Sequence, residues 1–149
     1  MNTTEKLNIN KKTAELENVK INVKIKLAAL WATLMFLYTY GDILGFYTPG
    51  NLEQLISGEI EGIQLTEGLL IVNAVSMTIQ SVMIFLSVAL KATANRWANL
   101  ILGVFAAIVL VVAIYVGGID VRYAIQTIIE LVLIALILWH AWKWPKQEA

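Results

Sequence analysis

The feature that most constrains this chain is an apolar run over residues 27–47, which reads LAALWATLMFLYTYGDILGFY. Lys24 and Lys26 precede the run, and Asp42 lies inside it. A helix of about 20 apolar residues crosses a hydrocarbon core of about 30 Å, so the run is long enough to span a bilayer. It predicts that lipid surrounds much of this protein.

Three further apolar runs of similar length follow, over residues 68–90, 97–116 and 121–142. Of the 149 residues, 58% are hydrophobic and 15% are charged, against about 45–50% and about 25% in an ordinary soluble domain. A chain of this size has too little other sequence to bury four apolar helices. The pattern therefore predicts an all-α membrane protein, folded as an antiparallel four-helix transmembrane bundle.

Polar stretches divide the chain around these runs. We expect a polar cytoplasmic tail over residues 1–26, a membrane domain over 27–144 with an outer loop at 48–67, and a short cytoplasmic tail at 145–149. The turn at 91–96 is so short that the second and third spans should be antiparallel neighbours. The first run is longer than the 7–15 residues of a signal-peptide core, which predicts an uncleaved anchor.

The basic residues predict the orientation of the spans. Ten of the 11 Lys and Arg residues lie in the N-terminal tail, the 91–96 turn or the C-terminal end, and only Arg122 lies on the other side. Short cytoplasmic segments carry an excess of Lys and Arg, so both termini are expected in the cytoplasm.

Aromatic residues cluster at the predicted ends of the spans, where Trp and Tyr favour the headgroup level. We expect interfacial anchors at the cytoplasmic ends, at Trp31, Trp97, Trp139, Trp142 and Trp144. The outer anchors are expected to be Tyr47, Tyr115 and Tyr123. His140 lies among the C-terminal Trp residues and is interpreted as part of that belt, because it has no second ligand nearby.

Several polar residues fall inside the spans. At 1.5 Å per residue, Asp42, Asn73 and Gln126 lie about 8 Å below the outer boundary of the hydrocarbon. Tyr38, Gln80 and Glu130 lie nearer the midplane. Helical spacing places the polar residues of one span on one face, so three spans are expected to turn a polar stripe to a shared interior. The candidate polar cluster comprises Tyr38, Asp42, Asn73, Gln80, Arg122, Gln126 and Glu130.

Two interpretations of this cluster stay open, because a carboxylate at membrane depth must be paired, hydrated or protonated. In the structural one, Asp42 pairs with Arg122, Glu130 bonds to Gln80 or Tyr38, and the network fixes helix register. In the functional one, Asp42 and Glu130 face a shared, water-accessible cavity that takes a proton, a cation or a small polar ligand.

The composition also excludes several kinds of site. The chain has no Cys and one His, which excludes disulfides, thiolate catalysis, Fe–S clusters, Cys-ligated zinc and a multi-His metal site. There is no phosphate-binding glycine loop and no Ser-His-Asp set. We therefore expect no enzyme activity, no metal, no cofactor and no nucleic-acid partner. The expected partner is the lipid bilayer, and a second copy of the chain is a candidate partner.

Three segments, residues 27–50, 94–103 and 127–144, resemble an uncharacterised family of small bacterial four-span membrane proteins. The features that carry this resemblance are Gly41 before Asp42, the NRWAN box at Asn95–Asn99, and the Trp-rich end. The resemblance implies a bacterial inner-membrane protein and supplies no activity.

The residues of the NRWAN box have a structural interpretation of their own. Asn95 is expected to cap the third span, Arg96 to meet cytoplasmic phosphates, and Asn99 to bond across helices. Taken together, the sequence favours a non-catalytic accessory or structural protein of the inner membrane. The alternative is a small oligomeric transporter or channel that uses Asp42 and Glu130.

Overall fold

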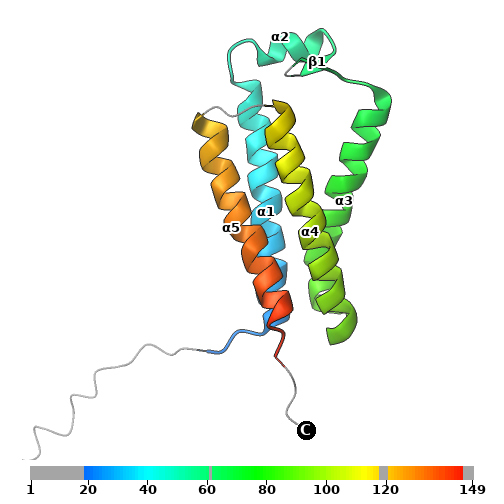
Figure 1. Ribbon diagram of the computed structural model, residues 1–149, viewed down its shortest axis with the longest axis vertical. Coiled ribbons are helices and arrows are strands. Elements are labelled where there is room, and N and C mark those ends of the chain that lie inside the picture. The colour runs from blue at the N-terminus through cyan, green and yellow to red at the C-terminus, as the bar shows by residue number, and fades with distance from the viewer. Residues whose placement is uncertain (1–18, 61, 118–120, 146–149) are drawn as a thin grey trace, which may run out of the picture.

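The computed structural model describes residues 19–60, 62–117 and 121–145, without the side chains of residues 116, 117, 121 and 122. In chain order the elements are α1 (Val23–Phe46), α2 (Asn51–Ile56), β1 (Glu59–Ile60), β2 (Ile63–Gln64), α3 (Glu67–Ala89), α4 (Ala92–Gly117) and α5 (Val121–Trp142) (Figure 1). The all-α class predicted from the apolar runs is confirmed.

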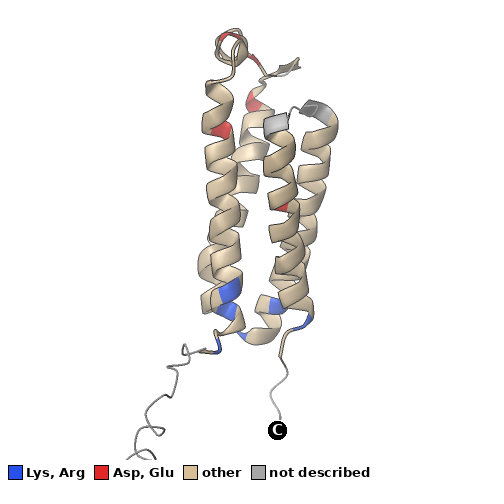
Figure 2. Cartoon of the chain, turned by 90° about the vertical axis from the view of Figure 1, so that its left-hand side faces the viewer, with Lys and Arg blue, Asp and Glu red and all other residues tan. Residues whose placement is uncertain are grey.

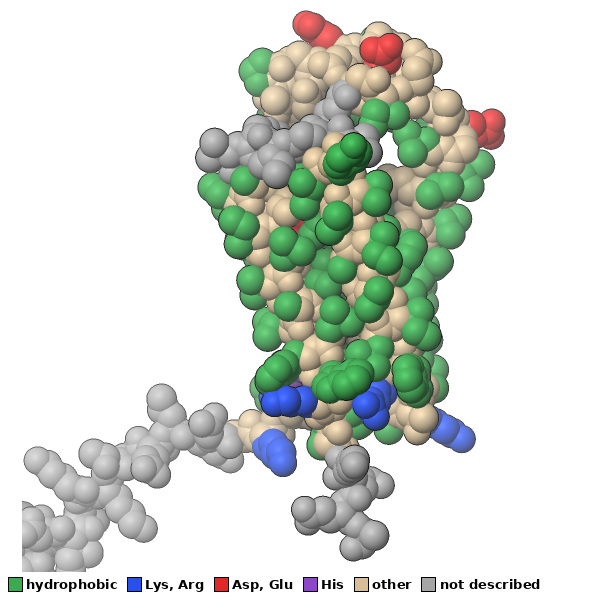
Figure 3. Space-filling model, in the orientation of Figure 1, with side chains coloured by type: hydrophobic (Ala, Val, Ile, Leu, Met, Phe, Trp, Pro, Cys, Tyr) green, Lys and Arg blue, Asp and Glu red, His purple; other side chains and the backbone are tan. Residues whose placement is uncertain are grey.

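Four of the five helices, α1, α3, α4 and α5, are long and apolar enough to cross a membrane. The shortest has 22 residues, which corresponds to about 33 Å of helix. Figure 3 shows hydrophobic side chains over most of the visible face of these helices, between the two polar ends. A large exposed apolar surface is unfavourable in water and suits a protein whose helices face lipid.

Two helices begin earlier than the apolar pattern predicted. α1 begins at Val23 because the Asn22 side chain caps it, accepting a hydrogen bond of 2.9 Å from the backbone N–H of Lys24. α4 begins at Ala92, so the expectation that Asn95 caps this helix is wrong. The backbone N–H of Asn95 already donates to the carbonyl of Lys91. Apolar periodicity marks the lipid-facing part of a helix and misses polar turns at its ends.

The four long helices lie side by side (Figure 1). α1 packs against α3 and α5, and α4 packs against α5 and, less extensively, α3. The described chain begins and ends at the same end of these helices, and α2 lies at the opposite end.

The loop over residues 48–67 holds the short helix α2 and a small hairpin that the sequence did not predict. β1 pairs antiparallel with β2, with Glu59 opposite Gln64. Gly58 and Gly62 flank this hairpin with φ values of 84° and 80°, a region that glycine adopts without steric penalty.

The core contains one residue that the sequence analysis had placed at the surface. Trp31 is 0% exposed and packs with Leu27 and Leu34 on the inward face of α1, so its assignment as an interfacial anchor is wrong. These three residues are spaced by three or four positions, which puts them on one helix face. The indole N–H of Trp31 needs an acceptor inside, and it donates to Asn99 Oδ1 at 2.7 Å.

The other predicted anchors differ in exposure. Trp97 and Tyr115 are exposed, as are Trp139, Trp142 and Tyr47, so all five have the surface position that an anchor requires. Trp144 is partly buried against the core, and Tyr123 is also partly buried.

A cluster of buried polar side chains joins three helices near the end where the described chain begins and ends. We call Trp31, Ser87, Asn95 and Asn99 the amide cluster, and each is 0% exposed. Asn99 Nδ2 donates to Asn95 Oδ1 at 2.6 Å and to the Asn95 carbonyl at 2.9 Å. Asn95 Nδ2 donates to the carbonyl of Ser87, and thereby links α4 to the last turn of α3.

Lys24 adds a further link between α1 and α3. Its Nζ donates to the carbonyl of Val88 at 3.2 Å and to that of Leu90. The last carbonyls of a helix have no partner within the helix, and a cation there is also favoured by the helix dipole. Lys24 therefore caps the end of α3 from a neighbouring helix.

Replacing Trp31 with Phe should lower the stability of the protein by about 1–2 kcal/mol, because Asn99 loses its closest cross-helix donor. The measurement is thermal unfolding in detergent micelles, followed by circular dichroism. Trp97→Phe is the matched control, since Trp97 is 58% exposed on α4. Equal effects of the two substitutions would contradict the role given to the Trp31–Asn99 bond.

Candidate functional site

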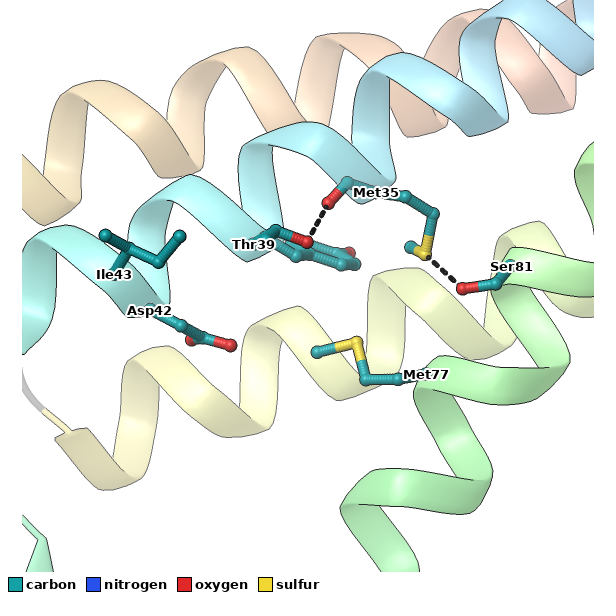
Figure 4. Close-up of a pocket in the computed structure, with 7 residues that line it drawn as sticks. Met35, Thr39, Asp42, Ile43, Met77 and Ser81 are labelled. Atoms are coloured by element: carbon teal, nitrogen blue, oxygen red, sulfur yellow. Dashed lines mark hydrogen bonds between the residues drawn. The ribbon is translucent and has the colours of Figure 1, made fainter.

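The first of the two intramembrane carboxylates lies at a cavity between α1 and α3. The cavity has a volume of about 230 Å³ and includes the exposed side chain of Asp42, four residues before the end of α1. Its other lining residues are Met35, Tyr38, Thr39, Ile43, Met77 and Ser81. In Figure 4 the carboxylate of Asp42 is directed into the space between the helices.

The two aliphatic hydroxyl groups in the wall of this cavity are engaged in hydrogen bonds. The hydroxyl of Thr39 donates to the carbonyl of Met35 at 2.9 Å, and that of Ser81 donates to the Met35 sulfur at 3.3 Å. Asp42 has no hydrogen-bond or ion-pair partner among the described residues. The cavity therefore presents one carboxylate, which no described residue pairs, against an aromatic ring and two thioethers.

The second carboxylate, Glu130, lies inside the protein and does not line this cavity. It is 3% exposed and accepts a hydrogen bond of 3.0 Å from Gln126 Nε2. The same nitrogen donates to the backbone carbonyl of Leu37 at 2.7 Å. Gln126 thus ties α5 to α1, and it is the partner of Glu130 in place of the predicted Gln80 or Tyr38.

Gly41 allows Gln126 to reach α1. A Cβ atom added at Gly41 would fall on the side-chain amide of Gln126, whereas one added at Gly45 would meet nothing within 4 Å. The resemblance had singled out the small residue before Asp42 without giving a reason for it. Its physical role is to make room for the amide of the facing helix.

The remaining members of the predicted polar cluster do not all come together. Gln80 is 1% exposed, and its Nε2 contacts Ser76 Oγ at 3.4 Å. Gln80 Oε1 and the hydroxyl of Thr127 are buried without a hydrogen-bond partner among the described residues. Tyr38 lies partly buried in the wall of the Asp42 cavity.

Asn73 is exposed and does not join the buried polar residues of α3. The buried residues of this helix are Ser76, Gln80, Met83 and Ser87, so none of them lies in its first nine residues. Figure 1 shows the first half of α3 set apart from the other long helices, which explains why a residue there reaches no shared interior.

Two further predictions concern residues outside this description. The side chain of Arg122 lies outside the described residues, so the pairing of Arg122 with Asp42 stays a prediction. Asp120 directly precedes the last apolar run, which makes it the predicted N-cap of that span, and it also lies outside them. Over residues 19–60, 62–117 and 121–145, no three metal-ligating side chains of the His, Asp or Glu type lie together.

Comparison with known proteins places the chain in a family. The model of a family of unknown function, DUF6326, matches residues 15–149. The chain belongs to this family. The resemblance drawn from Gly41–Asp42, the NRWAN box and the Trp-rich end is thereby confirmed as one to a family without an assigned function. No curated protein and no solved structure matches the chain.

Replacing Gly41 with Ala should disrupt the Gln126 contacts and lower stability by about 1–2 kcal/mol, because the new methyl group occupies the place of the amide. Gly45→Ala, one turn further along α1, is the control. It should be neutral or stabilising by up to about 1 kcal/mol, since Ala is the better helix former. Thermal unfolding in detergent micelles measures both. A Gly41→Ala variant as stable as Gly45→Ala would contradict this packing.

Proposed function

We propose that this chain is a multi-pass protein of the bacterial inner membrane, built as an antiparallel four-helix bundle with both termini in the cytoplasm. Its role is structural or accessory, with no catalytic chemistry of its own. The single observation that carries this proposal is that the buried carboxylate Glu130 is bonded to Gln126 inside the protein and is separate from the Asp42 cavity.

The distribution of charge supports the proposed orientation. Figure 2 shows Lys and Arg at one end of the long helices, where Lys24, Lys26, Arg96 and Lys143 lie, and most Asp and Glu towards the other. Positive charge favours the cytoplasmic side of a membrane. The proposed cytoplasmic end is therefore the one that carries both ends of the described chain.

The polar contacts inside the protein support a structural role. Trp31 to Asn99 joins α1 to α4, Gln126 to Leu37 joins α5 to α1, and Asn95 to Ser87 joins α4 to α3. Lipid gives no hydrophobic driving force between helices, so side-chain hydrogen bonds of this kind hold helices together and fix their register. Each buried polar residue in these contacts already has a use that requires no ligand.

A second candidate function is favoured by one observation, the unpaired Asp42 at its cavity. A small transporter or channel for a proton, a cation or a small polar ligand would use such a group, together with Glu130, and would need two copies to line a path across the membrane. Asp42 lines its cavity, whereas Glu130 is buried beside Gln126. Their separate surroundings favour the structural proposal over this one.

After Ala149, a green fluorescent protein fusion should fluoresce and an alkaline phosphatase fusion should be inactive. In the loop at 48–67, the alkaline phosphatase fusion should be active and the green fluorescent protein fusion should not fluoresce. The physical reason is the location of the basic residues at the end that carries the termini. Paired alkaline phosphatase and green fluorescent protein fusions, expressed in a bacterium, make this measurement. An external signal from the C-terminal fusion would overturn the proposed orientation.

Glu130→Ala should lower stability by about 1–2 kcal/mol, because Gln126 loses a buried acceptor and a cavity is left behind. Asp42→Ala should change stability by much less, since Asp42 is exposed and bonds to no described residue. Thermal unfolding in micelles distinguishes the two. A cation or proton flux in reconstituted vesicles that Asp42→Asn abolishes, at unchanged helix content, would instead favour the transporter.

A further inference from the structure

A second cavity lies at the other end of the molecule, in a groove between α1 and α5. It has a volume of about 280 Å³ and is lined by Lys26, Ala29, Leu30, Thr33 and His140. α1 and α5 pack against each other, so the two sides of the groove are held in place. From Lys26 to Thr33 the groove follows α1 for about 10 Å, from the basic end towards the middle of the helix.

Lys26 brings an uncommitted ammonium group to this groove. Its neighbour Lys24 is occupied, because its Nζ donates to the carbonyls at the end of α3. Lys26 is exposed and has no hydrogen-bond or ion-pair partner among the described residues. The groove also has no Asp or Glu in its lining, so its charge is positive.

His140 contributes a ring nitrogen whose role is set by its other nitrogen. Nδ1 lies 2.9 Å from the backbone carbonyl of Leu136. A carbonyl oxygen only accepts hydrogen bonds, so Nδ1 carries a hydrogen and the ring is held against its own helix. Nε2 is then the nitrogen available to a ligand, and it donates a hydrogen bond when the ring is protonated. His140 and Lys26 lie two and three residues from their helix ends, at about the same level.

Part of the lining of the groove is apolar. Ala29 and Leu30 make up this part, which we call the floor. Lys143 Nζ lies 3.8 Å from the centroid of the Trp139 ring, a cation–π contact that places another positive charge close to His140 in the sequence. The groove thus combines a cationic mouth with an apolar floor.

We propose that this groove binds one anionic phospholipid, with its phosphate at Lys26 and His140 and an acyl chain along Ala29 and Leu30. The cationic mouth selects a negative headgroup, and basic pockets between helices at the cytoplasmic surface are suited to such lipids. The apolar floor selects a lipid over a soluble phosphate ester. This inference rests on the proposed membrane placement of the helices, and it concerns residues that the polar contacts between helices do not use.

Native mass spectrometry of the full chain in detergent, titrated with phosphatidylglycerol, tests the proposal. One lipid should bind per chain. Lys26→Ala should weaken binding by about fivefold, the effect of losing one positive charge near a headgroup. His140→Gln should weaken binding by removing the imidazole from the groove, and the double variant should bind more weakly than either single variant. Lys91→Ala is the matched control, because Lys91 is exposed in the turn between α3 and α4 and does not line the groove. It should leave binding unchanged.

Phosphatidylcholine and sn-glycerol 3-phosphate complete the experiment. Equal binding of phosphatidylcholine would overturn the proposal, because the groove would then select only apolar chains. Competition by sn-glycerol 3-phosphate at the affinity of the lipid would also overturn it in favour of a soluble phosphate. Equal losses in Lys26→Ala and Lys91→Ala would mean diffuse surface attraction. Lipid binding in detergent is independent of orientation, so it fails or succeeds separately from the reporter fusions, and circular dichroism shows that each variant is folded.

Discussion

The hydrogen bond from Trp31 to Asn99 is the contact on which one end of this structure depends. It is buried between helices whose exposed side chains are mostly apolar. In such a site an unpaired indole N–H or amide cannot form a hydrogen bond to water instead. Asn99 in turn donates to Asn95, and Asn95 donates to the last turn of α3. One chain of hydrogen-bonded polar groups therefore fixes the register of α1, α3 and α4, and apolar side chains pack around it.

At the opposite end of the molecule the helices pack less closely. There α3 separates from the other helices, no side chain of α3 before Ser76 is buried, and Asp42 lines a cavity. The contact between Gln126 and α1 lies between these two regimes, and it depends on the absence of a side chain at Gly41. The helices thus pack closely at the end where the amide cluster links them, and less closely at the end where Asp42 has no partner among the described residues.

Much of the fold could be predicted from the sequence, because apolar runs of about 20 residues have few other uses in a chain this short. The helix starts were less predictable, since Asn22 and the polar first turn of α4 lie outside the hydrophobic pattern. Trp31 was misplaced because a Trp near the end of a span suits either an interface or a core. Only the facing residue Asn99, from a helix 68 positions away, decides between them.

The candidate site was predictable in its members but not in their pairing. Spacing along a helix places Gln126 and Glu130 on one face, and these two do bond. Depth alone also grouped Asn73 with them, although depth says nothing about the angle at which α3 leaves its neighbours. Glu130 has a partner on its own helix, Gln126, and Gln126 links α5 to α1 through the carbonyl of Leu37. Asp42 has none among the described residues, so any charge that it carries in lipid must be balanced by something the described residues do not supply.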